Sequence, residues 1–111
     1  MDEFPYVLVM EELQEVGMNF QDWVDKNSRI MDELVLEGAY FLQDGEYDSI
    51  TLIEIYAEDD LWSTVDLNFE DVIEALQHNE EHWVSREEYE RASEARDLIN
   101  IYKNKYKNDS L

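Results

Sequence analysis

The sequence predicts an α+β, mostly helical fold: a compact single domain with a central β-hairpin or three short strands and a long C-terminal amphipathic helix. Apolar residues recur at three- and four-residue intervals near both ends of the chain, which is typical of helices. The middle holds short β-branched runs on either side of an Asp-Gly pair, which favours strands. The 111 residues are 44% hydrophobic and contain no Pro/Gly-rich linker, so residues 1–111 are expected to share one modest core.

The first third of the chain predicts two helices. Residues 6–16 carry apolar side chains at helical spacing, and Gly17 is expected to end this helix. Asn19 is expected to cap a second helix that Gly38 stops. Because the polar stretch 26–29 interrupts the pattern of this second helix, two short helices are the alternative.

The middle third predicts strands. Residues 39–43 and 49–56 are apolar runs separated by the sequence Asp-Gly-Glu-Tyr, and an Asp-Gly pair between such runs favours a hairpin. Residues 61–67 are expected to form a third strand. Apolar residues between positions 50 and 61 also recur at helical spacing, so a helix is the alternative for this region.

The last third predicts two helices, the second of them long. Asn68 with Asp71 is expected to open the first, and Ser85 with Glu88 matches the capping box that starts the second. This second helix, of about 20 residues, is amphipathic. Its apolar stripe is expected to be a scaffold or a homodimer contact and includes Tyr89, Ala92, Ile99 and Tyr102.

Charge is the strongest compositional signal. The chain has 29 Asp and Glu against 8 Lys and Arg, a net charge of −21. Residues 1–84 hold 23 acids and two bases and so carry the whole imbalance, whereas residues 85–111 hold six of each and are neutral. Self-repulsion on this scale destabilises a compact state. The acidity therefore indicates either a solubilising surface, as in a salt-adapted source, or a negative surface that is itself the working part.

The sequence predicts no catalytic, metal or cofactor site, and we expect the protein not to be an enzyme. Residues 78–82 match the H-x-x-E-H zinc-peptidase pattern, but a domain of this size has little room for a third ligand and a substrate cleft. Residues 44–48 resemble the start of a calcium loop, but Ser49 replaces the required Gly and Ile55 the final Glu. Nucleotide-binding motifs are absent, and so is cysteine, which excludes thiolate metal sites.

The expected location is the cytoplasm, or the host cytoplasm for a phage-encoded protein. The N-terminus has acids where a signal peptide would have bases, and the apolar run 6–10 is too short to cross a membrane. We expect no membrane association. Direct nucleic-acid binding is disfavoured too, because phosphate contacts need clustered Lys and Arg and the only such cluster is a short C-terminal one.

The charge corresponds in scale to a short DNA duplex. B-DNA carries one negative charge per 1.7 Å of axis, so 21 charges correspond to about 36 Å, or about ten base pairs. In size, acidity, aromatic content and lack of cysteine, the chain resembles the DNA-mimic inhibitors of phages and mobile elements, such as anti-restriction and anti-CRISPR proteins. This resemblance implies an inhibitor that occupies the nucleic-acid-binding surface of a basic host protein.

Two other classes of function remain open. An immunity protein or antitoxin that neutralises a basic nuclease toxin depends on the same charge complementarity, but on a more local acidic patch. A non-catalytic adaptor domain needs the acidity only for solubility. For binding, the three tryptophans are either core residues or interface anchors. The acids expected to contact a basic partner are Glu11, Glu12, Glu15, Asp22, Asp25, Asp32, Glu33, Asp44, Glu46, Asp48, Glu58, Asp59, Asp60, Glu70, Asp71 and Glu74.

Overall fold

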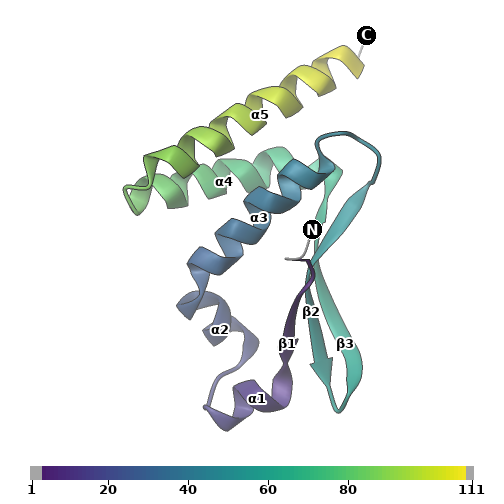
Figure 1. The fold of residues 1–111 in the computed structure, drawn as a ribbon, viewed down its shortest axis with the longest axis vertical. Coiled ribbons are helices and arrows are strands. Elements are labelled where there is room, and N and C mark those ends of the chain that lie inside the picture. The colour runs from purple at the N-terminus through teal and green to yellow at the C-terminus, as the bar shows by residue number, and fades with distance from the viewer. Residues whose placement is uncertain (1–3, 110–111) are drawn as a thin grey trace.

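A three-stranded sheet packs against helices in this α+β protein (Figure 1). The computed structural model describes the backbone of residues 4–109 and the side chains of residues 4–105. In chain order the elements are β1 (Tyr6–Val9), α1 (Met10–Glu15), α2 (Phe20–Lys26), α3 (Ser28–Leu42), β2 (Ser49–Ala57), β3 (Asp60–Asn68), the 3₁₀ turn η1 (Phe69–Asp71), α4 (Val72–Ser85) and α5 (Tyr89–Asp109).

The strand order is β1-β2-β3, with β1 parallel and β3 antiparallel to β2. The prediction of one helix over residues 6–16 is wrong for its first turn, because residues 6–9 form β1 and pair with β2. Leu8 of this strand is buried in the core. Parallel pairing and burial override the local helical spacing here.

The second predicted helix is two helices, α2 and α3, which meet at Asn27. Asn19 caps α2 as predicted: its Oδ1 accepts from the backbone N–H of Asp22, whose carboxylate accepts from the N–H of Asn19. The expected stop at Gly38 is wrong, because α3 continues to Leu42. The strand expected over residues 39–43 is therefore the last turn of a helix.

Gly38 is needed for packing rather than for a turn. A Cβ at this position would lie 2.8 Å from Leu52 Cδ2 and 3.2 Å from Leu67 Cδ2. The absence of a side chain thus lets α3 lie close against β2 and β3.

We expect Gly38→Ala to lower the free energy of unfolding by about 2 kcal/mol, because overpacking a filled core outweighs the helix propensity gained. Urea denaturation followed by circular dichroism measures this. Gly45→Ala is the comparison in which backbone strain and not packing sets the cost, because Gly45 has a φ of +75° and its Cβ position has only an ordinary contact, 3.9 Å from Lys105 Nζ. A stability gain in Gly38→Ala would contradict the close packing of α3 on the sheet.

The hairpin joins β2 to β3 through Glu58 and Asp59, not through the Asp-Gly pair, which lies in the loop between α3 and β2. The strand predicted over residues 61–67 lies within β3. Both turn residues have positive φ, +53° for Glu58 and +68° for Asp59, as a two-residue type I′ turn requires. The turn sequence is Glu-Asp and not the Asn-Gly that a type I′ turn prefers. The residue types therefore do not indicate a turn at this position.

Replacing the turn with Glu58→Asn and Asp59→Gly should stabilise the protein by about 1 kcal/mol, because Asn and Gly adopt positive φ with less strain. Thermal and urea unfolding measure the gain. The control Glu58→Gln with Asp59→Ala removes the same two charges without supplying these conformations, and should gain less. An equal gain in both variants would mean that relief of charge repulsion, not backbone strain, is responsible.

The turn between α4 and α5 differs from the prediction. The helix expected to start at Asn68 begins with the 3₁₀ turn η1. Ser85 does not cap the last helix. It ends α4, and its Oγ donates to the carbonyl of His82 at 2.7 Å. Glu87 has a φ of +62°, and its N–H and that of Glu88 donate to carbonyls of the last turn of α4. This is the closing pattern of a helix C-terminus.

The stripe of α5 is used as a scaffold inside the chain. Ala92, Ile99 and Tyr102 are buried, and the Tyr102 hydroxyl donates to the carbonyl of Ala39. Only Tyr89 of the four stripe residues is exposed. A homodimer through this helix stays a prediction, for which the stripe itself offers little free surface.

Candidate partner-binding surface

Acids from two distant parts of the sequence meet at the end of the molecule that contains α1 and the β2–β3 turn (Figure 1). The backbone N–H of Glu58 donates to the carboxylate of Glu11 at 2.6 Å, which joins the turn to α1. The predicted acids at this end are all exposed: Glu11, Glu12, Glu15, Glu58, Asp59 and Asp60.

A second group of predicted acids lies at the opposite end of the hairpin. The backbone N–H of Phe69 donates to the carbonyl of Asp48 at 2.7 Å, which joins the loop before β2 to η1. All the predicted acids of this group are exposed: Asp44, Glu46, Asp48, Glu70, Asp71 and Glu74. Each strand of the hairpin has nine residues, so the two ends are separated by about 30 Å.

Two acids that the sequence reasoning missed lie between these ends. Glu54 of β2 stands opposite Thr64, and Asp66 of β3 stands opposite Thr51. The Thr51 hydroxyl donates to Asp66 at 2.8 Å and the Thr64 hydroxyl at 3.2 Å. Strand alternation around these positions could have identified them, because their neighbours Ile53, Ile55 and Leu67 are apolar and face the core.

We call residues 44–74 the acidic hairpin segment. It contains eleven acids and no Lys, Arg or His. Within the described residues none of these acids makes an ion pair, and all but the half-buried Glu54 are exposed. Lys105 of α5 lines a hollow with Asp44 and Asp48, but the ion pairs of the described residues all lie outside this segment.

The arginines neutralise a different part of the molecule. Arg91 pairs with Glu33 at 3.0 Å and Glu94 at 2.9 Å, and Arg96 pairs with Glu80 at 2.8 Å. Arg29 pairs with Glu88 and with Glu33, and Arg86 pairs with Asp32. All four arginines of the chain thus bind carboxylates along the seam of α3, α4 and α5.

Two predicted contact acids, Asp32 and Glu33, belong to this seam. Asp32 is buried, and Glu33 is held by two arginines. Both acids were predicted to contact a partner, but in the structure they pair with arginines of the same chain. On α2, Asp22 takes part in the cap and Asp25 accepts from Gln21 at 3.0 Å, so these two have local roles at the surface.

Trp83 is the centre of the seam and is fully buried. The guanidinium groups of Arg29 and Arg86 lie 5.4 and 5.0 Å from its ring centroid. Its Nε1 donates to Asn79 Oδ1 at 2.8 Å, and Asn79 Nδ2 donates to the carbonyl of Asp32 at 2.8 Å. This network joins α3 to α4 through satisfied polar groups.

The carboxylate of Asp32 completes the network. Arg86 Nη1 lies 2.8 Å from Asp32 Oδ2, and neither atom has another partner among the described residues. His82 Nδ1 lies 2.9 Å from Asp32 Oδ1. His82, one of the two histidines of the zinc-like pattern, is thus bound to a structural carboxylate. Among the described residues no group of three or more His, Cys, Asp or Glu is placed to hold a metal ion.

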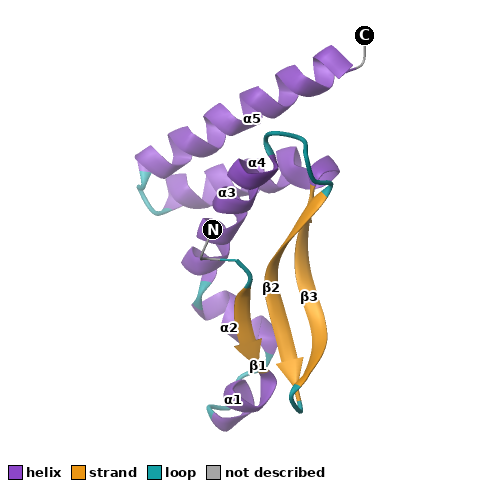
Figure 2. Cartoon of the chain, turned by 45° about the vertical axis from the view of Figure 1, so that its right-hand side comes forward, coloured by secondary structure: helices purple, strands orange, loops and turns teal. Residues whose placement is uncertain are grey.

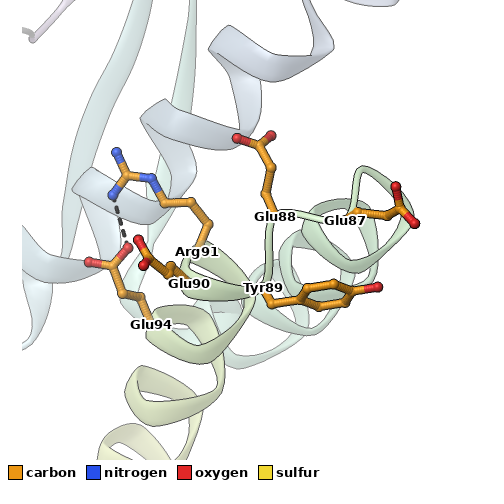
Figure 3. A pocket seen from close by; sticks show the side chains of 6 residues that line it. All are labelled: Glu87, Glu88, Tyr89, Glu90, Arg91 and Glu94. Atoms are coloured by element: carbon orange, nitrogen blue, oxygen red, sulfur yellow. Dashed lines mark hydrogen bonds and ion pairs between the residues drawn. The ribbon is translucent and has the colours of Figure 1, made fainter.

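A hollow at the α4–α5 turn is lined by four glutamates, Tyr89 and Arg91 (Figure 3). Three of its charged groups are engaged: Arg91 binds Glu94, and the hydrogen bond from Arg29 lowers the pKa of the Glu88 carboxyl below its usual value. Nearby, burial raises the pKa of the Tyr40 hydroxyl, which donates to Glu94 at 3.2 Å. These are contacts that stabilise the helical seam.

The three tryptophans divide between core and surface. Trp23 and Trp83 are buried, whereas Trp62 of β3 is 64% exposed.

In the part of the chain that the structure describes, no helix is long and apolar enough to cross a membrane.

Comparison with known proteins finds no protein-family model, no curated protein and no solved structure that matches this chain.

Proposed function

We propose that the protein is an acidic inhibitor that presents the charge of DNA to a basic partner and blocks its nucleic-acid-binding surface. The supporting observation is the acidic hairpin segment, whose eleven acids have no base among them and no ion pair in the described chain. Such a protein needs no catalytic group of its own. We therefore propose a non-enzymatic protein of the anti-restriction or anti-CRISPR type.

The distribution of charge favours a working surface over a merely solubilising one. Arginines are placed where α3, α4 and α5 meet, so the helical side is partly neutralised. On the hairpin side the acids form no ion pair among the described residues, although such pairs would relieve repulsion. A long acidic surface attracts a basic groove at long range and speeds its association.

The dimensions also suit this proposal. The Cα atoms span 51 × 32 × 21 Å, so the molecule is elongated. The hairpin, about 30 Å long, matches about nine nucleotides of one nucleic-acid strand at about 3.4 Å each. The elongated shape supports a mimic of a nucleic-acid segment more than it supports an immunity protein, which needs only a local patch.

The experiment is retention of bacterial lysate proteins on the immobilised chain at about 0.1 M salt, followed by washes at about 0.5 M salt and with DNA. Screening shortens from about 10 Å to about 4 Å between these salts, so an electrostatic complex should dissociate. We expect DNA-binding proteins to be retained and to be released by both washes. A single protein that resists salt and DNA would indicate an immunity protein. Absence of basic proteins would contradict the proposal and leave a single cognate toxin or an adaptor role.

A further inference from the structure

We propose that the outer face of the sheet around Trp62 is the anchor of the interface, and that the partner is a protein whose basic channel binds single-stranded nucleic acid. This inference rests on the proposed function and specifies the nucleic acid that the partner binds. It follows from an apolar patch on the acidic hairpin segment and the neighbouring strand β1 that is exposed among the described residues.

The outer face of the sheet lies away from the helices. Helix α3 packs on the inner face of the three strands that Figure 2 shows side by side, and the inner residues Ile53, Ile55 and Leu67 are buried there. Residues that alternate with these point outward. They include Val7, which is 53% exposed and stands opposite Glu54.

An apolar row crosses this outer face near the turn. Val9 of β1 stands opposite Tyr56 of β2, and Tyr56 stands opposite Leu61 of β3. Neighbouring strands are about 4.8 Å apart, so these side chains are contiguous. Within this row, Leu61 is apolar and yet 51% exposed.

A β-bulge adds Trp62 to the row. Ser63 stands opposite Ile55 and Leu61 opposite Tyr56, so Trp62 is an extra residue with no partner on β2. Bulges change the direction of side chains and are common beside functional sites. Here the bulge exposes the largest apolar side chain of the hairpin at its acidic end, within four residues of Glu58, Asp59 and Asp60.

An exposed indole among carboxylates matches the chemistry of single-stranded nucleic acid. Proteins that bind single strands combine a positively charged groove with aromatic side chains on which unstacked bases stack. In such a site, the ring of Trp62 can stack on the aromatic side chains in place of a base, and the neighbouring carboxylates can bind the basic groove in place of phosphates. A site that contacts only the phosphates of a duplex has no place for this ring, because the bases of a duplex are stacked inside it.

A second copy of this chain does not suit the surface. Each copy carries a net charge of −21, and the acids next to Trp62 would face like charges across a symmetric contact. Charge complementarity therefore selects a basic partner over self-association.

The test compares the immobilised parent chain with three variants and uses two eluents. Bacterial lysate is passed over the parent chain, Trp62→Ala, Trp62→Phe and Tyr89→Ala; bound proteins are then eluted with a 30-nucleotide single strand or with a 30-base-pair duplex. Tyr89 is the matched control because its ring is 60% exposed but lies at the α4–α5 turn. Circular dichroism checks that each variant is folded.

We expect the single strand to elute the major retained protein at a concentration at least about tenfold lower than the duplex does. Retention should fall about tenfold or more in Trp62→Ala, in line with the 1–3 kcal/mol of a base stacked on an aromatic ring. It should persist in Trp62→Phe and Tyr89→Ala. Equal elution by both DNAs, or unchanged retention in Trp62→Ala, would overturn this inference while leaving the proposed function intact. If the parent retains no basic protein, the proposed function itself fails.

Discussion

Trp83→Ala is expected to lower the free energy of unfolding by about 3–5 kcal/mol, a large part of the stability of so small a domain. Trp83 is fully buried and joins the helices of the seam. Its loss leaves a cavity, removes the ring between two guanidinium groups, and leaves Asn79 Oδ1 without its donor. Urea and thermal denaturation, followed by circular dichroism, measure the change.

Two controls separate the sources of this loss. Trp83→Phe keeps most of the apolar volume and removes the N–H group, so it should cost about 1–3 kcal/mol for the unsatisfied Asn79. Trp62→Ala removes an equally large but exposed ring, and should change stability by less than about 1 kcal/mol. Equal losses in Trp83→Ala and Trp62→Ala would contradict the role of the seam as the centre of stability.

Charge reversal in the acidic hairpin segment is the second large expected effect. The variant with Glu46, Glu54, Asp60 and Glu70 all changed to Lys should bind its partner at least about 100-fold more weakly, which corresponds to about 2.7 kcal/mol. None of these acids makes an ion pair within the described chain, so the fold should survive. Binding kinetics at several salt concentrations measure the effect, which should include a slower association.

The matched control reverses four exposed acids on α4, on α5 and in the turn between them, Glu81, Glu87, Glu90 and Asp97. Both variants change the net charge by the same amount, from −21 to −13. If position matters, the helix variant should keep most of the affinity. Equal loss in both would mean that only net charge matters, and unchanged binding in both would contradict the proposed function.

Much of the fold could be predicted from local patterns. The cap at Asn19 and the strand within residues 61–67 follow from residue types that act over a few positions. The errors arise where distant contacts decide. Residues 6–9 become a strand only because β2 lies beside them, and Gly38 continues a helix because it packs on the sheet.

The candidate site was less predictable than the fold. Composition identifies an acidic surface but not which acids share it, and so Asp32 was expected at an interface although arginine and histidine bind it in the interior. The arginine partners come from positions about 50 residues away along the chain, which no local pattern indicates. Likewise the exposure of Trp62 depends on a bulge in strand pairing.

Displacement of DNA from the retained partner tests the central claim most directly. The partner is loaded with fluorescently labelled DNA, and the chain is added while anisotropy and complex size are followed. We predict that the DNA is released as the chain binds, with an apparent affinity that weakens as salt rises. A ternary complex, in which the chain binds while the DNA stays in place, would contradict the account.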